Sequence, residues 1–188
     1  MVHLPNARDF NRRHEGWAPS AKARLAGFFY AGNWVASIIS EVCTTGKLSK
    51  AFLFLEAVTY TGVVIMLYVV IRIVNRKLAA IGTVIGLVGC VMIAFESFHW
   101  QTTPGGGTRL IGIYWILLGY LIARSTFMPK ILGISFSLAG VLWAASSFPA
   151  LKIGNWKALA GIPELALTIW LIAKGVRDDA WRAQSKKV

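Results

Sequence analysis

Long apolar runs separated by short polar segments dominate this chain. Six runs follow one another, at Leu25–Val42, Ala51–Ile71, Leu78–Phe98, Leu110–Ala123, Ile131–Phe148 and Ala158–Ala173. The second and third reach the roughly 20 residues that a helix needs to cross the hydrocarbon core of a bilayer. Because the runs are unbroken rather than alternating, they exclude the strands of a membrane barrel. The pattern predicts an all-α fold, a polytopic membrane bundle of six transmembrane helices.

The segments between the runs are short and contain turn residues such as Gly46, Pro104 and Pro129. Short connections make successive helices antiparallel neighbours. The fourth run is the shortest, and it reaches a full span only if Arg124 extends toward the interface. We expect a basic tail at 1–24, a transmembrane domain at 25–176 and a second tail at 177–188.

Composition supports a membrane location. The chain of 188 residues is 56% hydrophobic and 15% charged, whereas soluble domains are about half apolar and a quarter charged. The net charge of +12 does not indicate nucleic-acid binding, because the basic residues lie between apolar runs instead of along one face. Neither Cys43 nor Cys90 belongs to a CxxC pair, so the cysteines predict no cofactor.

The distribution of basic residues predicts the orientation. The two tails and the second and fourth connections hold fifteen of the 20 Lys and Arg residues, and the other three connections hold Lys47, Lys50, Arg109, Lys152 and Lys157. Because Lys and Arg collect on the cytoplasmic side of membrane proteins, both termini are expected in the cytoplasm. An even number of spans agrees with this orientation.

Acidic residues provide the main functional candidates. Four of the eight, Glu41, Glu56, Glu96 and Glu164, lie within apolar runs, and the predicted topology places all four in the outer third of the membrane. An ionisable group inside a span is costly and usually faces the bundle interior or a wet cavity. We expect an outward-facing pocket formed mainly by Glu56 and Glu164. Glu41 and Glu96 flank it, or simply reach the headgroups.

Two further patterns leave alternatives open. Glu96 and His99 are three residues apart, a spacing that places both on one helix face and permits a single metal ion. Small residues at four-residue spacing allow close helix approach, within the chain by default, or else with a partner protein or a second copy. These residues are Gly32, Ala36 and Ser40 in the first run, and Gly82, Gly86 and Cys90 in the third.

The carboxyl-terminal part resembles a known family. The stretch GYLIARSTFMPKILGISFSLAGVL at 119–142, followed by IPELALTIWLIAKGV at 162–176, is similar to the membrane-protein family known as domain of unknown function 4386 (DUF4386). Weaker matches lie at 24–27, 67–69 and 74–76. The resemblance implies a helical bundle in a bacterial inner membrane, with acids at Glu41 and Glu164, and it implies no activity. Pro163 stands where the family more often has Gly.

Three functions follow as hypotheses. The first is binding or passage of a proton, cation or small cationic molecule at the glutamates. The second is a structural or accessory subunit of a membrane complex, and the third is a membrane-bound metalloenzyme. The chain has no nucleophile motif, phosphate loop or nucleotide fingerprint, so a non-enzymatic role is favoured, with the lipid bilayer as the first partner.

Overall fold

The computed structural model describes residues 17–42, 47–97, 105–146, 148 and 156–186. Over these ranges the chain is helical and contains no strand, which confirms the predicted all-α fold. Six long helices precede one short one: α2 (Pro19–Val42), α3 (Lys47–Ile71), α4 (Arg76–Ser97), α5 (Gly106–Arg124), α6 (Lys130–Ser146), α7 (Trp156–Ala173) and α8 (Asp178–Ser185).

The six long helices coincide with the six apolar runs, and most boundaries agree within a few residues. The largest difference is the start of α2, at Pro19 rather than at Leu25. α5 also begins early, at Gly106 rather than at Leu110. The sequence there indicates a loop because of its glycines. In the structure Gly107 is helical and packs closely on α4, where an added Cβ would lie 2.7 Å from Cγ1 of Ile93. Gly107 therefore allows α5 to pack closely on α4. With its start at Gly106, α5 is long enough to be a membrane span.

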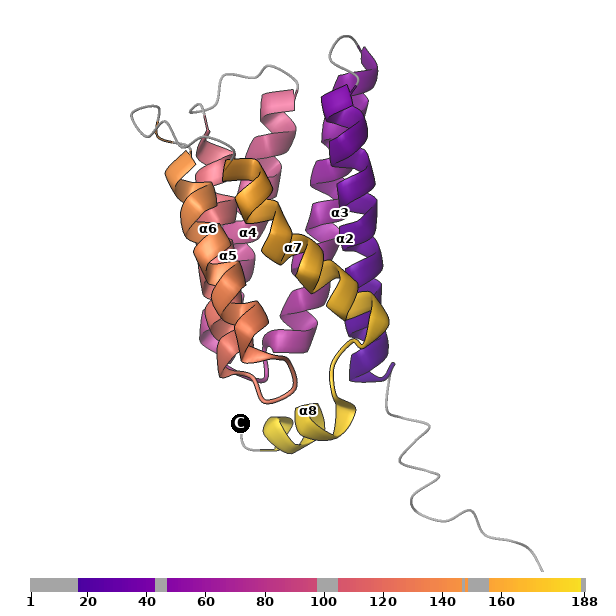
Figure 1. Cartoon of the computed structure of the whole chain (residues 1–188), viewed down its shortest axis with the longest axis vertical. Helices are drawn as coiled ribbons and strands as arrows, with labels where there is room; N and C mark the ends of the chain where they lie inside the picture. Colours follow the sequence, from indigo (N-terminus) through magenta and orange to yellow (C-terminus); the bar gives the residue numbers. More distant parts are fainter. Residues whose placement is uncertain (1–16, 43–46, 98–104, 147, 149–155, 187–188) are drawn as a thin grey trace, which may run out of the picture.

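The long helices run alternately up and down and form a closed ring (Figure 1). Each contacts the next in sequence, and α7 also contacts α2. α7 crosses the bundle obliquely. The start of α2 and the whole of α8 lie at one end of the bundle. We call this the basic end, because it carries Lys22, Arg24, Arg72, Arg76, Lys77, Arg124, Lys130, Lys174, Arg177, Arg182 and Lys186. The other end, where α2 finishes, is called the Glu41 end.

Within the described residues, three helices are long and apolar enough to cross a membrane, at Lys50–Ile71, Arg76–Glu96 and Gly106–Arg124. A fourth span results if α7 and α8, which are bent by 98° relative to each other, are taken together. α6 is apolar but has 17 residues, or about 25 Å, against a hydrocarbon core of about 30 Å. The structure therefore contains several helices that are candidate membrane spans, and the full set of six spans stays a prediction.

The short helix α8 was not predicted, since its sequence is polar and lies in the expected carboxyl-terminal tail. The chain turns into it after Gly175, whose φ of 63° is a conformation that glycine adopts without strain. Asp178 accepts hydrogen bonds from the backbone N–H and the Oγ of Ser20, at 2.8 and 2.9 Å. Trp181 donates from Nε1 to the carbonyl of Val70 at 2.8 Å. α8 thus joins α2 to α3 at the basic end.

The Asp178→Ala variant should lower stability, because Asp178 satisfies an otherwise unpaired amide in the first turn of α2. Loss of such a cap costs about 1 kcal/mol. Thermal unfolding of the purified protein in mild detergent measures the effect. Asp179→Ala, a change at the exposed neighbouring acid, should have little effect. Equal unfolding temperatures for the two variants would show that the cap contributes nothing.

The closest packing lies between α5 and α6. An added Cβ on Gly119 would lie 2.5 Å from the carbonyl oxygen of Gly133, and one on Gly140 would lie 2.7 Å from that of Gly112. The glycines are seven residues apart in each helix, so both pairs fall on one line of contact. Such contact allows helix backbones to approach closely in membranes. We refer to these four residues as the glycine seam.

The predicted small-residue faces are also used within the chain. Ala36 and Ser40 are buried, and Gly32 lies near Thr59 of α3. On α4, Gly82 and Gly86 pack against Leu117 and Tyr114 of α5. Cys90, on the same face, is buried too. These contacts agree with the default interpretation of intramolecular packing.

The Gly133→Ala variant should destabilise the bundle, because the new methyl group would collide with the backbone of α5. Overpacking of this kind costs about 1 to 3 kcal/mol. Gly82→Ala is the matched control, since its Cβ would meet Leu117 at an ordinary 3.6 Å and alanine favours helix over glycine. Thermal unfolding in detergent should therefore separate the two variants, and equal stability would contradict the seam.

Candidate functional site

The structure treats the four membrane glutamates differently. Glu41 is exposed in the last turn of α2, and Glu96 lies half-buried in the last turn of α4. Glu56 is half-buried in the first half of α3, and Glu164 is buried in α7 with 7% of its surface exposed. Glu56 and Glu164 are close enough to interact electrostatically. These are the two residues expected to form the main part of the pocket, and the pocket itself stays a prediction.

The depth of Glu164 differs from the prediction. α7 begins at Trp156 and ends at Ala173, which places Glu164 at the middle of the helix rather than near its entry in the outer third. Pro163 precedes it inside the helix, where it withholds an amide from the backbone ladder. Thr168 donates from Oγ1 to the carbonyl of Glu164 at 2.9 Å. The side chain of Glu164 itself is buried at the level of the middle of α7.

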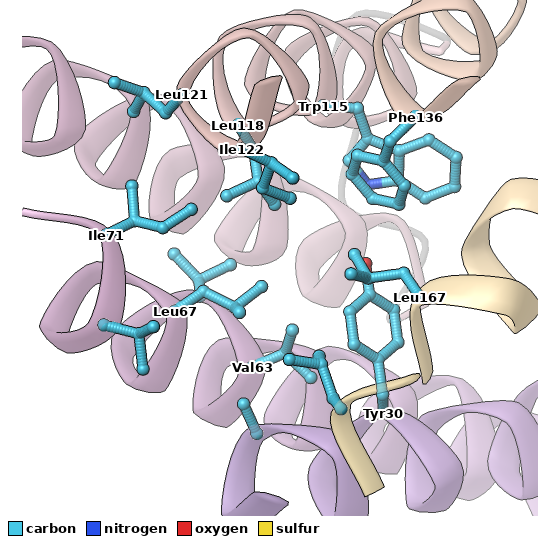
Figure 2. Packing of buried hydrophobic residues seen from close by; sticks show 14 of the residues in the cluster. Tyr30, Val63, Leu67, Ile71, Trp115, Leu118, Leu121, Ile122, Phe136 and Leu167 are labelled. Carbon is cyan, nitrogen blue, oxygen red and sulfur yellow. The ribbon is translucent and has the colours of Figure 1, made fainter. Parts of the chain in front are cut away.

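Three aromatic residues from other helices complete a polar layer at the same depth. Tyr30, Tyr60 and Trp115 lie near the middles of α2, α3 and α5. The two tyrosine hydroxyl groups are 3.4 Å apart, and Nε1 of Trp115 donates a hydrogen bond to the hydroxyl of Tyr60. Figure 2 shows the hydroxyl of Tyr30 directed toward Trp115 in the core.

Glu164 belongs to this polar layer. Both Tyr30 and Tyr60 interact electrostatically with Glu164, and both are fully or almost fully buried. The layer thus combines one buried carboxyl group with two hydroxyl groups and an indole N–H, contributed by four helices. A second carboxyl group, that of Glu56, lies within electrostatic range. We call Glu164, Glu56, Tyr30, Tyr60 and Trp115 the core polar site.

Buried polar atoms without a hydrogen-bond partner occur in α2 and α5, two of the helices that form the core polar site. Among the described residues these atoms include Oδ1 of Asn33, Nε1 of Trp34 and the hydroxyl of Tyr114. Trp34 reaches α7 at Gly161, one turn from Glu164, and Tyr114 interacts electrostatically with Tyr60. Unpaired buried polar atoms in a native protein usually have a functional reason or a bound partner.

The sequence interpretation missed the aromatic members of this site. Tyr30, Tyr60 and Trp115 stand inside apolar runs, where hydrophobicity does not separate them from ordinary core residues. Their position along the apolar runs could have identified them. Each lies near the midpoint of its run, whereas Trp and Tyr in membrane proteins favour the interfaces. A Tyr or Trp residue at mid-span is therefore a candidate member of a polar site in the bundle core.

The predicted metal pair is only partly placed. Glu96 is near the end of α4, and His99 lies outside the described residues. Within the described ranges, no three His, Cys, Asp or Glu side chains come together as a metal site requires. The four glutamates, all of them described, therefore do not form such a group. The site residues with ionisable carboxyl groups are Glu164 and Glu56, which can gain and lose protons or attract a cation.

The Tyr60→Phe variant should be less stable than Tyr30→Phe. The hydroxyl of Tyr60 serves both Tyr30 and Trp115, so its loss leaves the buried indole N–H unpaired, at a cost of roughly 1 to 3 kcal/mol. Tyr30→Phe loses only the 3.4 Å contact between the two tyrosine hydroxyl groups. Thermal unfolding in detergent compares the two, with exposed Tyr120→Phe as the control. A larger effect at Tyr30 would contradict the assignment.

The fold and the site define a class, that of helical membrane proteins with an ionisable group in the bundle core. The model of the family described as "Domain of unknown function (DUF4386)" matches residues 97–175. This match confirms the predicted resemblance over the part of the chain that contains α5, α6 and α7. No curated protein and no solved structure matches the chain.

Proposed function

We propose that the chain crosses a bacterial inner membrane six times, with both termini in the cytoplasm. Two observations support this topology. The first described helix, α2, begins at the end of the ring where α8 lies. An even number of crossings requires this arrangement. The basic residues of that end are those expected on the cytoplasmic side. The Glu41 end would then face outward.

Within this topology the chain binds or passes a proton or a small cation at the core polar site. The observation that carries this proposal is the burial of Glu164 at mid-bundle, beside the hydroxyl groups of Tyr30 and Tyr60. A charged group near the bilayer centre costs roughly 2.5 to 3.5 kcal/mol on insertion scales. A bundle built only for packing would place an apolar residue there.

The second carboxyl group, that of Glu56, supports the binding of a cation as well as of a proton. Two nearby carboxylates repel each other, so together they favour either a shared proton or a bound positive charge. Tyrosine hydroxyl groups both donate and accept hydrogen bonds, which suits either state. The core polar site is thus able to exchange a proton for a small cation, and that exchange is the chemistry we assign to it.

The alternatives receive less support. The small-residue faces of α2 and α4, offered as docking sites for an accessory subunit, pack within the chain. The metalloenzyme hypothesis depends on His99, which lies outside the described residues. Neither alternative explains why four helices contribute polar groups to the middle of the bundle.

The test replaces Glu164 by Gln, which keeps the shape and removes the charge. Purified protein sealed into liposomes with a trapped pH-sensitive dye reports proton flux, and intrinsic tryptophan fluorescence during titration with H⁺, Na⁺, K⁺ or tetramethylammonium reports binding. Glu164→Gln should abolish the responses, because the carboxyl group that carries them is gone. Glu164→Asp should retain part of them.

Asp179→Asn, at an exposed position of α8, is the control that changes net charge by the same amount outside the core polar site. Its flux and its fluorescence titrations should match those of the unmodified protein. If Glu164→Gln also behaves as the unmodified protein does in both assays, Glu164 has no such role.

A further inference from the structure

The core on the basic side of Glu164 is filled by large aliphatic side chains. From the middle of the bundle, α3, α5 and α7 continue downward to the basic end. Their fully buried residues below the core polar site include Val63, Leu67, Ile71, Ile122, Leu167 and Leu171, and we call these six the aliphatic layer. Figure 2 labels Val63, Leu67, Ile71, Ile122 and Leu167 among the buried side chains of the core. The buried polar residues of this half, Ser125 and Thr168, donate their hydroxyl groups to backbone carbonyls.

The core between Glu164 and the Glu41 end has a different composition. The buried residues described there are mainly small or polar, among them Asn33, Ala36, Ser40, Ala57 and Ala160. Ile111 is a larger aliphatic residue of this half, and it packs against Gly89 in the interface of α4 and α5. All the described large side chains that are fully buried lie at mid-bundle or toward the basic end.

This asymmetry affects how water and ions reach Glu164. An aliphatic core excludes water, and hydrophobic constrictions in channels close by dewetting. A small cavity beside the aliphatic layer, lined in part by Leu67 and Ile71, is itself mostly apolar. A charge crossing such a layer without partners loses its hydration at a high cost. Small and polar side chains leave more room and supply hydrogen bonds. Glu56, half-buried in that same half of α3, brings a second ionisable group between Glu164 and the Glu41 end.

We propose that the core polar site exchanges with water from the Glu41 end only, and that the aliphatic layer is its barrier toward the basic end. This inference rests on the proposed function and makes it more specific. In this conformation the protein holds its proton or cation in a pocket with access from one side. Passage across the membrane then requires α3, α5 and α7 to separate at the aliphatic layer.

Cysteine accessibility tests the proposal directly. In a chain whose Cys43 and Cys90 are replaced by Ser and Ala, single cysteines are introduced at Asn33, Glu56, Leu67 and Ile122. A charged, membrane-impermeant methanethiosulfonate reagent is applied from each side of sealed vesicles of known orientation. Asn33→Cys and Glu56→Cys should react from the side of the Glu41 end alone. Leu67→Cys and Ile122→Cys should react from neither side until the protein is denatured.

The outcomes separate this inference from the proposed function. Reaction of Leu67→Cys or Ile122→Cys from the basic side would overturn the barrier, and so would the absence of reaction at both Asn33→Cys and Glu56→Cys. Labelling does not depend on what Glu164 binds. One-sided labelling together with an inert Glu164→Gln variant would therefore uphold the access route and reject the proposed function.

A second measurement covers variants that fold poorly. Leu67→Asn places a polar group in the aliphatic layer and should create a proton leak in liposomes, one that is lost again in the Leu67→Asn, Glu164→Gln double variant. Leu138→Asn, on the exposed surface of α6, is the matched control and should not leak. An equal leak from both single variants, or a leak unaffected by Glu164→Gln, would contradict the proposal.

Discussion

An ionisable group in the middle of an apolar bundle must be supported by its surroundings, and this constraint organises the structure. Glu164 is buried at the midpoint of α7, where an unsupported charge would be unstable. The hydroxyl groups of Tyr30 in α2 and Tyr60 in α3 lie within electrostatic range of Glu164, and the indole of Trp115 in α5 donates a hydrogen bond to Tyr60. These contacts set which faces of α2, α3 and α5 turn inward, because a rotation of any of them would leave a buried polar group unpaired.

The rest of the bundle provides a rigid frame for the core polar site. On one side, the glycine seam holds α5 and α6 at backbone contact, so Trp115 is carried by a closely packed helix pair. It also stacks with Phe136 and Trp143 of α6, at ring-centre distances of 4.7 and 5.1 Å. At the basic end, α8 joins the start of α2 to the end of α3 through Asp178 and Trp181. The helices that carry Tyr30 and Tyr60 are thereby fixed below the site.

The sequence predicts the helices well and the site only in part. Hydrophobic runs locate six of the seven described helices, because burial in lipid requires long apolar segments. The same rule cannot find α8, whose eight polar residues are held by specific contacts. Acids in apolar runs stand out, so Glu56 and Glu164 are found. Tyr60 and Trp115 are not, because an aromatic residue counts as apolar until its partner is known. The helix boundary does not explain the shallower depth expected for Glu164, since α7 begins only two residues before the predicted run.

The central claim is that Glu164 gains and loses its proton, or exchanges it for a cation, through the Glu41 end. Infrared difference spectroscopy on oriented, sealed vesicles measures the carboxyl C=O band that disappears in Glu164→Gln. The account predicts that this band responds when the pH is changed on the side of the Glu41 end and stays constant when only the opposite side is changed. A band that responds from the basic side, or from neither side, would contradict it.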